Sequence, residues 1–193
     1  MITVDDIAVR DFTLADIEPM LEYWLSPENE RYHRRRGTDP SKWIDPDRER
    51  RALSTVVDTP IPERSHSAAV VVYRGQPVGH VLLNDLKAPA RRRMHFHMWR
   101  RKIERSSLTD TIALTKKIVS ASLEYFFTTH GIDEIVGDVA VSNRAANFVL
   151  RAMRIFPSET VDESYLGETQ AYNRYVFKRA PVSCDCFSAY GSL

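Results

Sequence analysis

The amino-acid sequence predicts a mixed α/β (α+β) fold in which helices flank a mostly antiparallel central sheet. Three patterns support this prediction. Residues 68–83 form two β-rich runs around a turn with glycine and proline, residues 94–99 alternate like a strand, and residues 108–130 carry apolar side chains at helical spacing. Strands and helices in this mixed order pack as layers around one core, which favours a single mixed sheet.

Length and composition predict one domain. The chain has 193 residues, 43% of them hydrophobic, enough for a sizeable core. We expect a domain over residues 1–180, a loosely ordered tail over 181–193, and a monomer or homodimer. The formal net charge of +1 offers no overall field for nucleic acid, and no signal-peptide pattern or run of about 20 apolar residues occurs. We therefore expect a cytoplasmic protein with neither nucleic acid nor a membrane as partner.

The N-terminal part predicts one strand followed by a helical layer. The expected elements are a strand over 2–11, a helix over 14–25, and a helix from Asp45-Pro46 to Val57. Thr13 and Asp16 match a capping box at the start of the first helix. Pro19 predicts a kink, because an interior proline removes a helical hydrogen bond. The segment over 23–57 is expected to form a helical lid or wall.

The middle of the chain predicts three neighbouring strands. They are expected over 68–73, 78–83 and 94–99. Period-two alternation places His95 and His97 on one face of the third strand. Met94, Phe96 and Met98 then take the other face, and the basic cluster Arg91–Arg93 precedes the strand.

The C-terminal half returns to alternating helices and strands. The expected elements are a helix over 108–130, a strand over 132–141, a helix over 144–154 and a strand over 172–178. Ser107 and Asp110 match a second capping box, and Gly131 fits the position just after the helix. Asn143 is a typical N-cap for the short helix.

This order and two junctions resemble the GNAT acyltransferases over about residues 7–178. The segment 73–83 looks like the central hairpin of that family, with Val78-Gly79 opening a strand. Asn143-Arg-Ala-Ala146 is similar to the family's N-x-x-A segment, which is the more specific likeness. His95-Phe-His97-Met-Trp99 resembles a GNAT subgroup with an H-x-H-x-W strand.

The resemblance implies acetyl-CoA, or another acyl-CoA, as cofactor, and no metal. The family's phosphate loop, R/Q-x-x-G-x-G/A, corresponds here to residues 100–108, which lack its glycines. Serines and basic side chains there can still bind pyrophosphate beside the first turn of a helix. The residues expected to bind the cofactor are Met98, Trp99, Arg100, Arg105, Ser106, Ser107, Leu108, Thr109, Asn143 and Asn147. Cys184 and Cys186 lack a second ligand pair for zinc.

Three residues are candidates for catalysis: His95, His97 and Asp138. A neutral imidazole can accept the proton of an attacking amine near pH 7, and Asp138 could orient a histidine or the acceptor. The alternative is a pair of core histidines and an ordinary sheet-edge aspartate. The tyrosine that often protonates the departing thiolate in GNAT enzymes is replaced by Leu150. Water, Tyr165, Tyr172 or the attacking amine itself could then supply that proton.

The resemblance implies one function and leaves two alternatives open. The expected activity is acyl-CoA-dependent N-acetyl transfer to a small amine-containing molecule. A degenerate GNAT domain that senses acyl-CoA, or a protein N-acetyltransferase, are the alternatives. The arginine clusters 34–36 and 91–93 could bind the 3′-phosphate of coenzyme A or an acidic acceptor, although basic runs are usually solvated surface.

Overall fold

The computed structural model describes residues 2–4, 6–34, 44–88, 92–99, 108–165 and 168–179. They form an eight-stranded mixed sheet in the order β1-β2-β3-β4-β5-β6-β8-β7. The strands are β1 (Ile2–Val4), β2 (Ile7–Asp11), β3 (Ser67–Tyr73), β4 (Gln76–Asn84), β5 (Arg93–Met98), β6 (Glu134–Ala140), β7 (Glu159–Tyr165) and β8 (Glu168–Lys178). Every neighbouring pair is antiparallel except β5 and β6, which confirms the predicted mostly antiparallel sheet.

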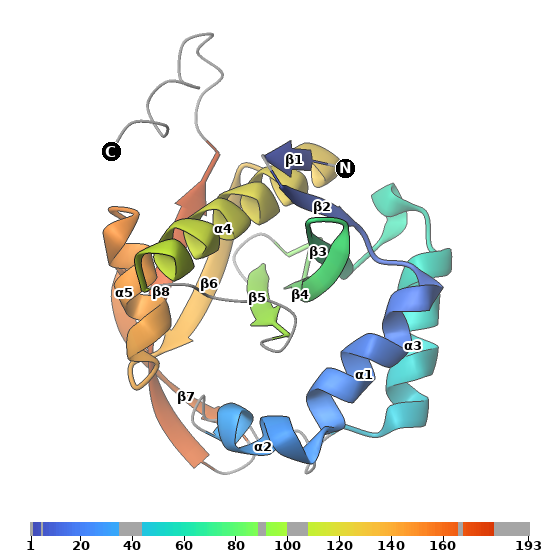
Figure 1. Cartoon of the computed structure of the whole chain (residues 1–193), viewed down its shortest axis with the longest axis horizontal. Coiled ribbons are helices and arrows are strands. Elements are labelled where there is room, and N and C mark those ends of the chain that lie inside the picture. Colours follow the sequence, from blue (N-terminus) through green and yellow to red (C-terminus); the bar gives the residue numbers. More distant parts are fainter. Residues whose placement is uncertain are drawn as a thin grey trace, which may run out of the picture.

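Helices cover both faces of this sheet. They are α1 (Ile17–Leu25), α2 (Pro27–Arg34), α3 (Pro46–Asp58), α4 (Leu108–His130) and α5 (Arg144–Ala152), with short 3-10 turns η1 (Leu14–Asp16) and η3 (Ile61–Glu63). Helix α4 crosses one face, while α1 and α3 lie on the other (Figure 1). One hydrophobic core joins α4 and α5 to the sheet, and a second joins α1 and α3 to β3 and Trp99.

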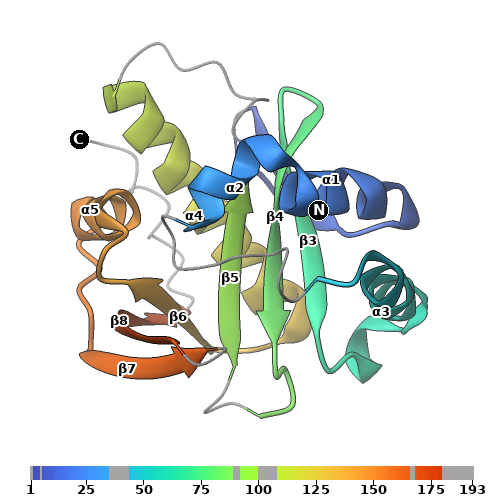
Figure 2. The same cartoon turned by 90° about the horizontal axis from the view of Figure 1, so that it is seen from below.

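Strands β5 and β6 diverge, and this divergence positions the site. Their parallel pairing is recorded at one position, Arg93 opposite Val136. In Figure 2, β3, β4 and β5 lie side by side, while β6 and β8 turn away from β5. We call the diverging segments, His95–Met98 on β5 and Asp138–Ala140 on β6, the β5–β6 fork. Backbone groups at a fork leave the ladder and become available to a ligand.

Local sequence signals explain most elements. Asp45 caps α3 through its carboxylate, which accepts from Asp47 N and Arg48 N at 3.0 and 3.1 Å. Gly131 has a φ of +60° just after α4, the left-handed conformation expected there. The hairpin, the long helix and the Asn143 cap are likewise confirmed.

Two expectations about elements were wrong, and one strand was not predicted. The single strand predicted over 2–11 is a hairpin of β1 and β2, because the chain reverses near Asp6, a residue type that favours turns. The helix predicted over 14–25 does not break at Pro19. It begins as the 3-10 turn η1 and continues as α1 from Ile17. Pro19 is the third residue of α1, where the backbone N–H would have no helical partner, so proline costs little there. The edge strand β7 was not predicted, because its sequence is largely polar.

Candidate active site

His95 and His97 lie on the same face of β5, as the alternation predicted. His95 pairs with Leu82 of β4, and His97 pairs with His80. This is the face that packs against α1 and α3, because Leu82 and Trp99 belong to the core on that side. The two imidazoles therefore share a side of the sheet, but their surroundings differ.

His97 is packed into a cluster of aromatic rings. Its ring centroid lies 4.3 Å from that of Trp24, 6.0 Å from that of Tyr23 and 5.0 Å from that of His80. The ring of His33 on α2 stacks on Trp24, with the two ring centroids 4.8 Å apart. His97 is partly buried, and helices α1 and α2 lie over it.

His80 is a buried member of this cluster whose role was not predicted from the sequence. It is 0% exposed, and Trp99 donates its indole N–H to His80 Nδ1 at 2.9 Å. An indole nitrogen only donates, so neutral His80 carries its proton on Nε2, which has no hydrogen-bond partner among the described residues. Burial, with a smaller contribution from His33, lowers the pKa of His80 to about 3. The only sequence signal for a special role of His80 was its position as a polar residue inside the apolar run 78–83.

His95 is more exposed than His97. The residue is exposed, yet neighbouring protein atoms desolvate its imidazole. The resulting desolvation lowers the pKa of His95 below its ordinary value; Asp138 opposes this effect and Arg93 adds to it. The ring is therefore neutral near pH 7 and able to accept a proton.

Asp138 is held between two guanidinium groups. Arg93 Nε lies 2.9 Å from its Oδ2, and Arg174 donates to Oδ1 at 2.9 Å and to Oδ2 at 3.2 Å. Arg93 is on β5, whereas Asp138 and Arg174 are on β6 and β8. The carboxylate oxygens are thus occupied by donors, and a direct catalytic role for Asp138 stays a prediction.

Asn143 and Asn147 anchor α5. Asn143 Oδ1 accepts from Ala146 N at 3.4 Å, the expected cap. Asn147, expected from the resemblance to bind the cofactor, is buried, and its side chain makes four hydrogen bonds. Its Nδ2 donates to Ala140 O and Asn143 O at 3.0 and 2.9 Å, and its Oδ1 accepts from Asn173 Nδ2 and Tyr175 Oη at 2.9 and 2.6 Å. A contact with the cofactor would have to compete with these bonds.

The remaining predicted cofactor residues fall into two groups. Met98 and Trp99 are buried at the end of β5, Met98 against the α4 side and Trp99 against the α1 side. Leu108 and Thr109 form the first turn of α4, whose N-terminal amides are suited to an anion. Arg100, Arg105, Ser106 and Ser107 lie outside the described residues, as do Arg35, Arg36 and Arg91.

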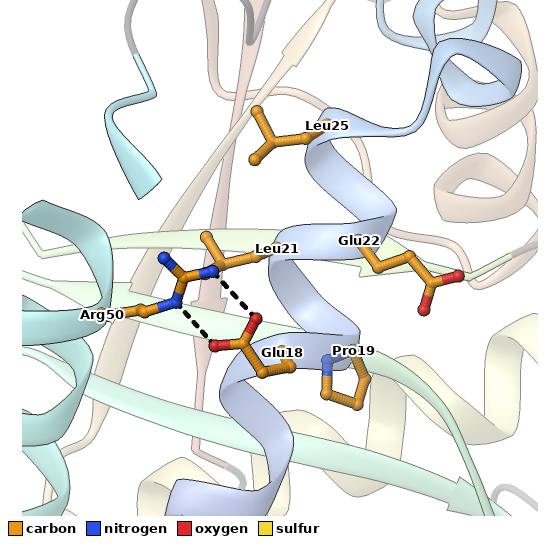
Figure 3. A pocket seen from close by; sticks show the side chains of 6 residues that line it. All are labelled: Glu18, Pro19, Leu21, Glu22, Leu25 and Arg50. Atoms are coloured by element: carbon orange, nitrogen blue, oxygen red, sulfur yellow. Dashed lines mark hydrogen bonds and ion pairs between the residues drawn. The ribbon is translucent and has the colours of Figure 1, made fainter. Parts of the chain in front are cut away.

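A surface hollow of about 410 Å³ lies between α1 and α3 (Figure 3). Its lining residues are Glu18, Pro19, Leu21, Glu22, Leu25 and Arg50. Arg50 Nε donates to Glu18 Oε1 at 2.6 Å, so this pair is internally satisfied. The hollow contains none of the candidate catalytic residues, and we do not assign the donor site to it.

Comparison with protein families decides the identity of the fold. A family model described as an acetyltransferase (GNAT) domain matches residues 6–154, most of the chain. This chain belongs to the GNAT family. A search of the curated proteins found no match.

Solved structures of GNAT proteins share this fold at low sequence identity. RimL, a ribosomal L7/L12 alpha-N-protein acetyltransferase in complex with coenzyme A, matches with a TM-score of 0.68 and 13% identity, over 91% of this chain and 95% of that chain. Spermidine N-acetyltransferase from Vibrio cholerae, in complex with CoA and spermine, matches with a TM-score of 0.65 and 14% identity, over 91% and 96%. At these identities the likeness shows the fold.

GNAT membership gives the reaction class. The chain is an acyltransferase with acetyl-CoA as donor, within the expectation of acetyl-CoA or another acyl-CoA that the resemblance implied. The likeness to an H-x-H-x-W subgroup stays a prediction. Within the described ranges, no helix is long and apolar enough to cross a membrane, and no group of His, Cys, Asp and Glu side chains could hold a metal ion.

The position of the usual GNAT tyrosine holds a core residue. Leu150 is buried among apolar side chains of α4 and α5. Tyr172 lies on β8 opposite Ala140, and two residues before Arg174. Alternation places Tyr172 on the same face as Arg174, which contacts Asp138. Tyr172, one of the two tyrosines considered as acids, therefore lies on the same side of the sheet as His95.

Proposed function

We propose that this GNAT protein transfers an acetyl group from acetyl-CoA to the amino group of a small molecule, with His95 as general base. The observation that carries the proposal is the position of His95. It is an exposed, neutral imidazole on β5, at the point where β5 and β6 diverge. His97 is the second candidate for the base, and its ring is covered by Tyr23 and Trp24.

The donor would bind at the β5–β6 fork. Its pantetheine arm can use the backbone groups that leave the ladder there, and the pyrophosphate can use the amides of the first turn of α4. The amine then attacks the thioester carbonyl carbon, a C–N bond forms, and the C–S bond breaks. His95 takes the proton from the amine. Tyr172, water or the amine itself returns a proton to the departing thiolate.

The helical layer supports a small acceptor. Helices α1 and α2 lie over the face of β5 that carries His95 and His97; Trp24 packs on His97, and His33 stacks on Trp24. A folded protein or a long peptide would need a wider approach to that face. The cytoplasmic location and the monomeric or homodimeric state stay predictions.

The test is a direct assay of acetyl transfer. The purified protein would be incubated with acetyl-CoA and either a panel of small amines or peptides with free N-termini, with free thiol and acetylated product measured. We expect acetylation of at least one small amine, lost in His95→Ala and kept in His66→Ala, which removes an exposed loop histidine. Acetylation of peptides alone would favour the protein acetyltransferase, and binding of acetyl-CoA without turnover on any acceptor would favour the sensor.

A further inference from the structure

We propose that Arg92, Arg93, Asp138 and Arg174 form a clamp that sets the divergence of β5 and β6, and that they thereby position the donor. We call these four residues the fork clamp. The inference rests on the proposed function in so far as the donor binds at the β5–β6 fork. In this proposal the fork clamp acts by holding the strands in position. Its residues do not contact the cofactor phosphates or the acceptor.

Arg92 joins the two strands where their pairing begins. Val136 N donates to Arg92 O at 3.1 Å. The buried guanidinium of Arg92 donates to Leu86 O at 3.0 and 3.3 Å, and to Glu134 O at 3.1 Å. One side chain therefore ties the loop before β5 to the first residue of β6. Three of the five N–H donors of this buried guanidinium are directed at backbone carbonyls, which favours a structural role over phosphate binding.

Arg93 continues the link beyond the last backbone pair. It lies opposite Val136, and its side chain reaches Asp138 two residues farther along β6. The pair therefore spans the diverging strands where the recorded ladder has ended. In a ladder, hydrogen bonds fix the distance between strands, and beyond it a side-chain contact has to do so.

Arg174 extends the clamp across the rest of the sheet. It contacts both oxygens of Asp138 and also lies 3.1 Å from Glu159 and 3.0 Å from Glu163 on β7. A continuous series of ion pairs thus runs from β5 through β6 and β8 to β7. Asp138 fixes β5 relative to the β6–β8–β7 part of the sheet.

Burial distinguishes this network from an ordinary surface ion pair. The side chains of Arg93 and Asp138 are 23% and 10% exposed, whereas those of Arg74 and Asp6, paired at 3.1 Å, are 69% and 59% exposed. Removing one member of a buried network takes a partner from a desolvated charge and is costly, while an exposed pair contributes little. The Arg74–Asp6 pair is therefore a matched control on another part of the sheet.

The experiment compares Asp138→Asn, Arg93→Gln and their combination with Arg74→Gln. Coenzyme A is the probe, its dissociation constant is measured by calorimetry, and amide hydrogen exchange at Val136 is followed in the free protein. We expect each single clamp variant to weaken coenzyme A binding on the order of tenfold and to speed exchange at Val136. The double variant should bind coenzyme A no more weakly than Asp138→Asn alone, because Asp138→Asn already removes the Arg93–Asp138 ion pair that Arg93→Gln removes. Arg74→Gln should change neither quantity.

The two readouts separate failure of the clamp from failure of the proposed function. Unchanged affinity and exchange in the clamp variants would overturn the clamp. If the wild-type protein does not bind coenzyme A, the proposed function fails, and exchange at Val136 alone decides whether the clamp holds the strands. Should Asp138→Asn unfold, Arg93→Lys keeps the charge with a shorter reach; faster exchange confined to β5 and β6 would support the clamp, and wild-type exchange would contradict it.

Discussion

At the scale of residues, His95 and His97 show what alternation along one strand can and cannot predict. Their shared face follows from period-two geometry alone. Their unequal exposure does not, because Tyr23 and Trp24 contact His97 from a helix distant in the sequence. The ion pairs of Asp138 with Arg93 and Arg174 are likewise contacts between strands whose neighbourhood no local pattern specifies.

Replacing His95 should remove the general base. We expect His95→Ala to lower kcat by about 10²–10⁴-fold while leaving the affinity for acetyl-CoA nearly unchanged, because loss of a base affects proton transfer rather than donor binding. Steady-state kinetics on an identified acceptor measures this. The acid limb of the wild-type kcat/KM profile should have its midpoint below the ordinary histidine pKa, because desolvation lowers the pKa of His95. Full turnover in His95→Ala would make His97 the leading base.

His80 should make stability depend on pH. Its folded-state pKa of about 3 lies below the ordinary value of 6.5, so between these values the unfolded chain binds a proton that the folded protein does not. Stability from His80 is therefore complete above pH 6.5 and is lost as the pH falls toward 3. Between pH 7 and pH 5 this amounts to about 2 kcal/mol.

The test for His80 is urea unfolding at pH 7 and pH 5, with His80→Gln as the comparison. Glutamine does not titrate, and its side-chain oxygen can accept from the Trp99 indole. We expect the variant to lose less stability than the wild type on acidification. Equal losses in the two proteins would mean that His80 is protonated in the folded state, contrary to its burial.

At the scale of elements, local signals predicted best the elements that local interactions define. The capping residues Thr13, Asp45 and Asn143 and the helical spacing over 108–130 each act within a few residues, and the structure has them where the sequence predicted. Pro19 misled, because its effect depends on where the first turn of α1 begins. Strand β7 carries few apolar side chains and exists because β8 offers it an edge.

Gly79 permits the close approach of β4 to β5. A Cβ there would lie 2.6 Å from His97 O and 2.9 Å from Met98 Sδ. Gly79→Ala should therefore destabilise the protein by about 1–3 kcal/mol, because β5 must shift to relieve the overlap. Chemical denaturation measures this change. Gly75→Asn is the control in the same hairpin, since nothing lies within 4 Å of its Cβ position and asparagine tolerates its φ of +77°. An unchanged denaturation midpoint in Gly79→Ala would show that β4 and β5 can accommodate a Cβ at this position without destabilisation.

At the scale of the whole molecule, the sheet order brings the site together. The fork combines β5 and β6, which are separated in sequence by α4, with Arg174 from β8. The fold class could be predicted from the order of elements and the likeness to GNAT proteins. The network at the fork could not, because it depends on which strands become neighbours after the chain has crossed the sheet.

Binding of the donor at this junction should stabilise the whole fold. A ligand that binds only the folded state at 100 times its Kd adds about 2.7 kcal/mol, which corresponds to a rise in Tm of about 5–10 °C for a chain of this size. We expect acetyl-CoA and coenzyme A to produce such a rise, measured by differential scanning calorimetry at increasing ligand concentration. ATP is the control, because it supplies adenine and phosphates without the pantetheine arm that the fork would hold. A similar rise with ATP would point to binding through the nucleotide alone, and no rise with either thiol or thioester would contradict donor binding by the folded protein.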